Sequence, residues 1–334
     1  MTYVESPSFD PYFNIAMEQH LFETIGKDED IFFLWRNENA IIIGKNQNAE
    51  TEINKYFVGE NGVKVVRRLS GGGAVYHDLG NVNFTFITNH EKHELHEKNQ
   101  SLDMRGFCEK IASFLRSLGA DARFGGRNDV TISGRKVSGG AQYVRDGRVM
   151  HHGTVLFDSN LDNVGCALKP PAGKLESKGV ASVRSRVTNV SEHISEKFGI
   201  IEFMDKLKHF ILGDDYTEYK LTETDNEVIT KLKDEKYSVW EWNFGKSPRF
   251  SLRKSRFVPG CGTVEIYYEA NNGVIQAVEF FGDYFGSLDT SELAALLVGC
   301  RLEEGAVRQA LAGVDVGLYF HNITTDGFIK ILLS

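Results

Sequence analysis

Apolar residues recur along this chain in short runs and at helical spacing, with glycine and polar turn signals between them. The runs 31–35 and 40–43 predict two buried strands around a polar turn. Before them, helical spacing from Asn14 to Thr24 follows Pro11, a residue that suits a helix entrance. The alternation at 82–88 predicts another strand.

A β-meander is predicted in the middle of the chain. Two turn sequences, Ser133-Gly134 and Arg145-Asp146-Gly147, separate three strand-like segments: 130–132, 136–144 and 149–157. Helical periodicity occurs on either side of the meander, at 102–118, 195–212 and 223–236. The meander therefore predicts a sheet with helices around it.

A second, smaller domain is expected at the C-terminus. The chain of 334 residues exceeds the usual size of one hydrophobic core. The segment Trp240–Pro248 has little periodicity and suits a boundary, so we predict domains at 1–245 and 246–334. The C-terminal part shows strand, strand, helix and helix, a compact α+β unit, at 262–269, 273–281, 290–297 and 304–311.

Composition and charge narrow the function classes. The net charge of -8 argues against a nucleic-acid-binding protein, because a phosphate backbone requires a basic face. Four scattered cysteines without a CxxC pair suggest neither a zinc site nor a disulfide framework. No signal peptide or run of about 18 apolar residues is found, so we expect a soluble, cytoplasmic protein that does not bind membranes.

The chemically most informative segment is Arg67–Asp78, which reads RRLSGGGAVYHD. Three consecutive glycines let the backbone approach a bulky anion, and arginines supply charge, so the segment suits phosphate binding. A surface hairpin loop that uses its glycines only for positive φ is the alternative. Gly44-Lys45, after a predicted strand, is a second candidate anion site.

Lys136 follows the tight Ser133-Gly134 turn and precedes small residues that leave room for a ligand. It could be a positioned charge on a carboxylate or phosphate, although a strand lysine more often faces solvent. Asn128-Asp129 could bind a ribose, an amine or a metal ion, or could simply be turn residues.

The histidines suggest no metal site. His151 and His152 are adjacent on a predicted strand and point to opposite faces, so at most one faces a pocket. His90, His93 and His96 lie in a Glu/Lys-rich stretch that is typical of a solvated connector. No P-loop is present, so any nucleotide must be bound in another way.

Taken together, these motifs resemble the lipoate-protein ligase A family. The resemblance covers the first three quarters of the chain, and the C-terminal part matches mainly by size and by the presence of a small accessory domain. The matching stretches are DPYFNIAME (10–18), IIIGKNQ (41–47), RRLSGGGAVYHDLGNVN (67–83), GRNDVTISGRKVSGGA (126–141), HHGTVL (151–156), KGVASVRSRVTN (178–189) and WEWNFG (240–245).

This resemblance implies an α+β fold, with a mixed β-sheet catalytic domain of the biotin/lipoate ligase type and a small α+β accessory domain. It implies an enzyme that activates lipoate with ATP to lipoyl-adenylate and then transfers the lipoyl group to a lysine on an acceptor domain. Magnesium is expected with the ATP, near Asp129. The implied acceptors are E2 subunits of 2-oxoacid dehydrogenases and the glycine-cleavage H protein, and the implied state is a monomer.

Site residues follow from the resemblance position by position. Lys136 is the implied catalytic residue, in contact with both the lipoate carboxylate and the α-phosphate. The residues implied in ATP and adenylate binding, besides Lys136, are Arg68, Gly73, Ala74, Val75, Tyr76, Lys178 and Arg184. Those implied in lipoate binding, besides Lys136, are Ser70, Gly72, His77 and His152.

Three alternatives are set against this interpretation. An octanoyl or lipoyl transferase would use a cysteine nucleophile and no ATP, but 122–136 contains no cysteine and Cys108 lies in a predicted helix. A biotin ligase would need a GRGRxGR-type loop, which is missing. A non-catalytic relic of the fold would have no chemical need for Arg68, the glycines and Lys136 together.

Overall fold

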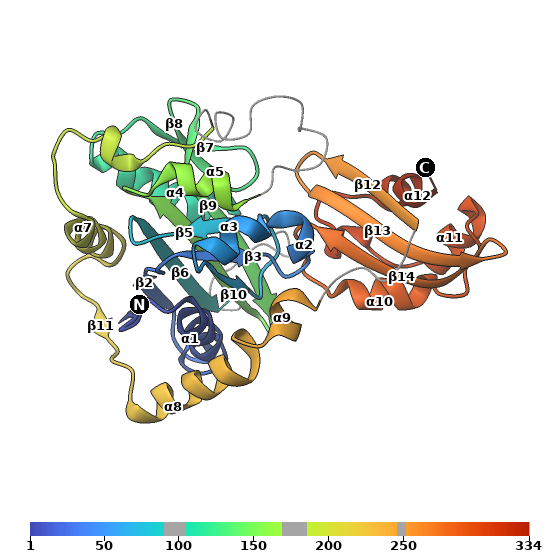
Figure 1. Ribbon diagram of the computed structural model, residues 1–334, viewed down its shortest axis with the longest axis horizontal. Helices are drawn as coiled ribbons and strands as arrows, with labels where there is room; N and C mark the ends of the chain where they lie inside the picture. Colours follow the sequence, from blue (N-terminus) through green and yellow to red (C-terminus); the bar gives the residue numbers. More distant parts are fainter. Residues whose placement is uncertain (90–103, 169–185, 246–251, 334) are drawn as a thin grey trace.

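The structure is a computed structural model, and Figure 1 shows that it consists of a larger N-terminal and a smaller C-terminal part. The predicted connector with its three histidines lies outside the described residues, as do Lys178 and Arg184. The described residues are 1–89, 104–168, 186–245 and 252–333.

A mixed eight-stranded sheet lies at the centre of the larger part. Its strand order is β11-β1-β2-β6-β10-β9-β8-β7. β1 pairs in parallel with β2 and β11, and the other pairs are antiparallel. In chain order the strands are β1 (Thr2–Glu5), β2 (Ile31–Trp35), β6 (Asn81–Asn89), β7 (Ala122–Gly125), β8 (Asp129–Ile132), β9 (Arg135–Arg145), β10 (Arg148–Leu156) and β11 (Thr217–Glu218).

The helices of this part are α1 (Pro11–Glu23), α2 (Ala49–Glu52), α3 (Lys55–Glu60), α4 (Met104–Ser117), α5 (Leu161–Ala167), α7 (Ile200–Leu212), α8 (Glu223–Leu232) and α9 (Trp240–Phe244). The predicted helix 14–24 is α1, which begins earlier because Asp10 caps it, accepting a hydrogen bond from the N–H of Tyr12. α7 begins later than predicted, and α8 continues as a π-helical turn to Tyr237.

The central strands bury side chains on both faces of the large sheet. On β2, Phe32 and Leu34 belong to the hydrophobic core with α4 and α7, whereas Phe33 and Trp35 belong to the core with α1. A strand buried on both faces reads as an uninterrupted apolar run. The sequence therefore predicted the bounds of β2 correctly.

Three more strands form a second sheet in the order β4-β3-β5, with β3 (Ala40–Ile43), β4 (Lys64–Arg67) and β5 (Val75–His77). β3 is parallel to β4 and antiparallel to β5. The prediction found both apolar runs, 31–35 and 40–43, but it did not find that they belong to different sheets. Local periodicity defines a strand, whereas its pairing depends on residues far away in the chain.

Both predicted turns of the meander are confirmed. Ser133 and Gly134 have φ of 51° and 75°, and Asp146 and Gly147 have φ of 52° and 69°. Positive φ at both central residues is the type I′ geometry that matches the twist of a hairpin. These turns pair β8 with β9 and β9 with β10, and they place Lys136 at the start of β9.

The smaller part is an antiparallel sheet of β12 (Leu252–Val258), β13 (Gly262–Asn271) and β14 (Val274–Gly282), packed with α10 (Thr290–Leu297), α11 (Glu304–Ala310) and α12 (Thr325–Leu333). It has its own hydrophobic core, which includes Ile266, Phe280, Leu293 and Phe328. The predicted α+β class is confirmed; β12 and α12 were not predicted. Among the described helices, none has the length and apolar character to span a bilayer.

Candidate functional site

A pocket lies where the glycine loop, residues 70–74, meets the meander β8–β10. One residue of the C-terminal part, Asp283, also contributes to it. The lining residues that the sequence predicted are Arg68, Gly72, Gly73, Ala74, Val75, His77, Lys136 and His152. Segments from distant parts of the chain thus come together in one site.

Two predicted residues do not face the pocket with their side chains. Tyr76 is buried on the opposite face of β5, where its hydroxyl donates to Asn39 at 2.9 Å. Ser70, at the start of the loop, does not line the pocket, and its hydroxyl contacts His152 and Arg68. Strand alternation explains Tyr76, since its neighbours Val75 and His77 line the pocket.

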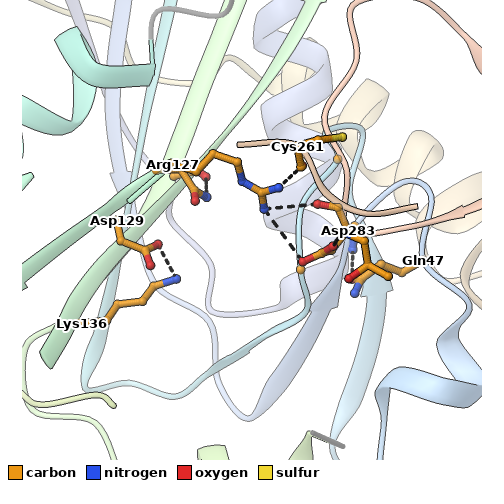
Figure 2. A network of polar contacts seen from close by, with 12 residues as sticks. Gln47, Arg127, Asp129, Lys136, Cys261 and Asp283 are labelled. Atoms are coloured by element: carbon orange, nitrogen blue, oxygen red, sulfur yellow. Dashed lines mark hydrogen bonds and ion pairs between the residues drawn. The ribbon is translucent and has the colours of Figure 1, made fainter. Parts of the chain in front are cut away.

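Lys136 is held at the pocket by its surroundings. Its Nζ is 2.8 Å from Oδ1 of Asp129, as Figure 2 shows. A Cβ on Gly139 would come within 2.6 Å of that Nζ, so the absence of a side chain there makes room for the lysine. The N–H of Lys136 donates to the carbonyl of Arg186 at 2.7 Å, and its carbonyl accepts from the N–H of Thr188 at 3.0 Å. The structure places the Lys136 ammonium at the pocket and in an ion pair, although its side chain is still 37% exposed.

Arg68 shapes the glycine loop from behind. Its guanidinium is 6% exposed and donates to the carbonyl oxygens of Gly71 and Gly73 at 2.6 and 2.9 Å, and to Ile42 at 3.1 Å. Burial lowers the pKa of Arg68 to about 10, opposed by the charge of Glu18, and the group remains a cation at neutral pH. Arg68 therefore lines the pocket while its donors are engaged with the loop.

Arg67 points away from the pocket, into the protein interior. It is fully buried, and its guanidinium donates hydrogen bonds at 2.6–3.1 Å to the main-chain carbonyls of Gly44, Lys45, Gln47, Trp242 and Asn243. Arg67 is the last residue of β4 and Arg68 follows the strand, and the two guanidinium groups have different hydrogen-bond partners. Arg67 joins the turn after β3 to α9.

Of the histidines near the site, His77 lines the pocket and His151 does not. His77 accepts a hydrogen bond from Asn37 at Nδ1, at 3.1 Å, which leaves the proton on Nε2. Burial lowers the pKa of His77 to about 3, with smaller contributions from Arg68 and His152, so it is a neutral donor at the pocket. His151 lies on the other face of β10, stacked on Phe107 with ring centroids 4.6 Å apart.

The C-terminal part contacts the site directly. Arg127 donates to the carbonyls of Cys261 and Asp283, and its guanidinium lies 4.4 Å above the ring of Phe285. Gly72 donates its N–H to the carbonyl of Tyr284 at 3.4 Å. These contacts close the pocket between the two parts. Arg127 lies in a motif that the sequence singled out, but nothing in the sequence indicated the C-terminal partners.

Other site residues were also not predicted from the sequence. Trp35, Ile42 and Asn83 line the pocket from β2, β3 and β6. Ile42 and Asn83 lie in matching stretches of the sequence, but neither these residues nor Trp35 was singled out as a site residue. Lys45, in the second candidate anion site, pairs with Asp289 at 2.9 Å and so connects the two parts.

The partly buried carboxylate of Glu52 makes stability depend on pH. Burial, then the negative charges of Asp283 and Glu265, raise the pKa of Glu52 to about 7. A raised carboxylate pKa means that ionisation opposes folding: the cost is absent below the ordinary pKa and is complete above about pH 7. Glu52→Gln removes the ionisation, so we expect it to raise the free energy of unfolding by about 2 kcal/mol at alkaline pH.

This difference should disappear below about pH 3.5, where Glu52 is protonated in both folded and unfolded states. Urea unfolding at both pH values measures it, with Glu60→Gln on the exposed face of α3 as the matched control. An equal effect of Glu52→Gln at both pH values would contradict the assignment.

Comparison with known proteins was made by sequence and by structure. The lipoyl protein ligase A/B catalytic domain matches residues 10–211, and the bacterial lipoate protein ligase C-terminus matches residues 247–332. A lipoate-protein ligase of Bacillus subtilis, LplJ, is 43% identical over 327 residues, which cover 97% of each chain. Lipoate–protein ligase 1 of Staphylococcus aureus is 38% identical over 325 residues, again 97% of each chain.

Three solved structures extend the comparison. P. falciparum LipL1 in complex with lipoate has a TM-score of 0.76 and 26% identity, covering 99% of this chain and 98% of that one. A bipartite lipoate protein ligase of Thermoplasma acidophilum, described with its E2 lipoyl domain, has a TM-score of 0.63 and 31% identity, covering 75% and 98%. Lipoate-protein ligase A bound with ATP has a TM-score of 0.62 and 29% identity, covering 73% and 98%.

These matches extend along nearly the whole chain. The chain therefore belongs to the lipoate-protein ligase family, with an A/B-type catalytic domain followed by the C-terminal domain of the bacterial ligases.

Proposed function

We propose that this protein is a lipoate–protein ligase that acts in two steps. The carboxylate of lipoate attacks the α-phosphorus of ATP, giving lipoyl-adenylate and releasing pyrophosphate. The ε-amine of an acceptor lysine then attacks the lipoyl carbonyl, giving an amide and releasing AMP. The observation that carries the proposal is that Lys136 and the glycine loop line one pocket.

Lys136 provides the electrostatic part of the first step. Two anions, the lipoate carboxylate and the triphosphate, must approach each other, and a fixed ammonium between them lowers their repulsion. Asp129 pairs with that ammonium at 2.8 Å. Substrate oxygens would compete with Asp129 for the same charge.

Of the other residues at the pocket, some would contact ATP and others lipoate. Gly73 to Tyr76 would form the backbone wall around ATP, with the charge of Arg68 behind it. Gly72, His77 and His152 would contact lipoate, and Ser70 would act through His152. Lys178 and Arg184 are assigned to adenylate binding on the sequence resemblance alone.

Magnesium would arrive with the triphosphate. Among the described residues, no group of three or more histidine, cysteine or acidic side chains is arranged to hold a metal. Asp129 and Asp283 both line the pocket, and Mg²⁺ is commonly bound by one or two carboxylates together with substrate phosphates. These residues fit such an ion, which would neutralise part of the phosphate charge.

The acceptors we propose are lipoyl domains of E2 subunits and the glycine-cleavage H protein. The Thermoplasma relative, which is described with an E2 lipoyl domain, supports the first class. We further propose a cytoplasmic monomer with a catalytic domain at 1–245 and an accessory domain at 246–334. The separate hydrophobic core of the C-terminal part supports this division.

The decisive test combines the protein with ATP, magnesium and lipoate. We expect pyrophosphate release and a hydroxamate when hydroxylamine is added, followed by amide formation when an apo lipoyl domain is supplied. Omission of lipoate is the control for unspecific ATP hydrolysis. Absence of any lipoate-dependent adenylate would overturn the proposal.

The same assay separates the ligase from an ATP-independent transferase. A transferase would need a nucleophilic cysteine at the pocket. Of the described residues that line it, none is a cysteine. Lipoyl transfer from a carrier without ATP would be the result that favours the transferase.

A further inference from the structure

A buried chain of hydrogen bonds connects helix α1 to the glycine loop. It begins at Glu18, which is 1% exposed and has its Oε1 2.7 Å from Nδ1 of His152. The other ring nitrogen, Nε2, lies 2.5 Å from the Ser70 hydroxyl. That hydroxyl in turn accepts from Nε of Arg68 at 3.0 Å.

Glu18 also connects to a second wall of the pocket. Its Oε1 accepts from the Thr85 hydroxyl at 2.8 Å, and this hydroxyl accepts from the indole N–H of Trp35 at 3.2 Å. Trp35, His152 and Arg68 all line the pocket, but Glu18 does not. The Glu18 carboxylate is therefore connected by hydrogen bonds to Trp35, His152 and Arg68, although Glu18 itself does not line the pocket.

A buried carboxylate is costly unless it is paired and hydrogen-bonded. Among the described residues, the ion-pair partner of Glu18 is His152, and no lysine or arginine lies within ion-pair distance. The hydrogen bonds that Glu18 accepts therefore compensate for its burial. They indicate that Glu18 orients its hydrogen-bond partners, His152 and Thr85.

The carboxylate sets the direction of the whole chain. An ionised carboxylate can only accept, so the proton of His152 must lie on Nδ1. In the neutral imidazole, Nε2 then accepts from the Ser70 hydroxyl, and a lone pair of that oxygen is left for Arg68. Arg68 is thereby fixed where it can bind the carbonyls of Gly71 and Gly73.

The glycine loop takes its shape from these two carbonyl contacts. In a trans peptide the C=O and the N–H point in opposite directions, so the N–H groups of Gly72 and Ala74 point away from Arg68. Gly72 uses its N–H on Tyr284, and Ala74 lies at the pocket. The contact between Arg68 and the Gly73 carbonyl therefore fixes the direction of the Ala74 N–H, which an anion in the pocket could accept.

From this geometry we infer that Glu18 is a positioning residue of the adenylation site, acting through His152 and Ser70 on Arg68. The inference rests on the proposed function, because it concerns the rate of adenylate formation. Glu18 itself does not line the pocket. Its effect is to hold the glycine loop and Trp35 in the conformation that the reaction needs.

The test uses Glu18→Gln, Ser70→Ala and the double variant in the full-length protein. We expect each single variant to lower kcat for lipoate-dependent pyrophosphate release at least tenfold, with KM for lipoate changed less than threefold. Because both act through one chain, the double variant should lose no more than about threefold beyond the slower single variant. Multiplied losses would overturn the inference, as would a wild-type rate in Glu18→Gln.

Glu23→Gln is the matched control, because it makes the same change on the same helix at an exposed position. We expect it to keep the wild-type rate. If Glu18→Gln does not fold, Ser70→Ala decides: a wild-type rate in this variant would overturn the inference. Wild-type protein that forms no adenylate would instead overturn the proposed function.

A spectroscopic measurement tests the geometry separately. Long-range ¹H–¹⁵N spectra of the histidine rings report which nitrogen carries the proton. We expect His152 of the wild-type protein to be the Nδ1–H tautomer and its signals to change in Glu18→Gln but not in Glu23→Gln. An Nε2–H tautomer in the wild-type protein would contradict the proposed direction.

Discussion

Replacing Lys136 by alanine is expected to abolish lipoyl-adenylate formation while leaving the protein folded. The ammonium lies at the pocket, with Asp129 as its ion-pair partner, and its removal leaves two anionic substrates without the charge between them. Loss of one preorganised electrostatic donor typically costs a factor of about 10²–10³ in kcat, or about 3–4 kcal/mol. Since Lys136 would act on both reacting groups, the upper part of this range is expected.

The measurement is lipoate-dependent pyrophosphate release, together with thermal unfolding to show that the variant is folded. Lys64→Ala, which removes a half-exposed lysine paired with Asp10, is the control and should keep the wild-type rate. Chemically prepared lipoyl-adenylate separates the steps, because transfer to an apo acceptor then needs no activation. A Lys136→Ala variant that forms adenylate at the wild-type rate would refute the assigned role.

Arg67→Met is expected to produce the largest loss of stability in the catalytic domain. The side chain is fully buried, and it satisfies carbonyl groups on the turn after β3 and on α9. Methionine has a similar length but no donor, so all of the hydrogen bonds from the guanidinium to these carbonyls would be lost. Removing one side of a buried charged network costs about 3–5 kcal/mol, more than the gain from burying an apolar chain.

Urea unfolding measures this loss as a lower midpoint with an unchanged m-value. The control is Arg123→Met on β7, where the arginine side chain is 75% exposed, and its effect should stay within about 0.5 kcal/mol. Arg67→Lys should fall between the two, because the ammonium keeps the charge but reaches fewer carbonyls. An Arg67→Met protein as stable as the wild type would show that the network contributes little.

Arg67 and Arg68 also show where sequence reasoning succeeded and where it stopped. The motif correctly marked the glycine loop as part of the site. It presented both arginines as charge for a phosphate, but the structure places one behind the loop and the other in the interior. Arg67 is the last residue of β4 and Arg68 follows the strand, and which of them lies at the pocket depends on the layers packed against them.

Tyr76 and Asp283 also show that motif membership does not decide which side chains line the pocket. Tyr76 lies in the middle of the most specific motif, yet its ring packs with Ile41 and Ile43 away from the pocket. Asp283 lies in no motif, yet it lines the pocket because the C-terminal part packs against the glycine loop. A motif identifies a backbone segment, but it does not give the direction of each side chain.

Local chemistry within the sequence determined most of the longer strands and helices, the type I′ turns and the placement of Lys136 at the start of β9. Periodicity and turn residues act over a few positions, so they can be read without a partner. Only the tertiary structure decided the split of β2 and β3 between two sheets, the hydrogen bonds from Glu18 to Arg68, and the closure of the pocket by Arg127 and Asp283. Those features depend on contacts between residues far apart in the chain, and periodicity contains no record of them.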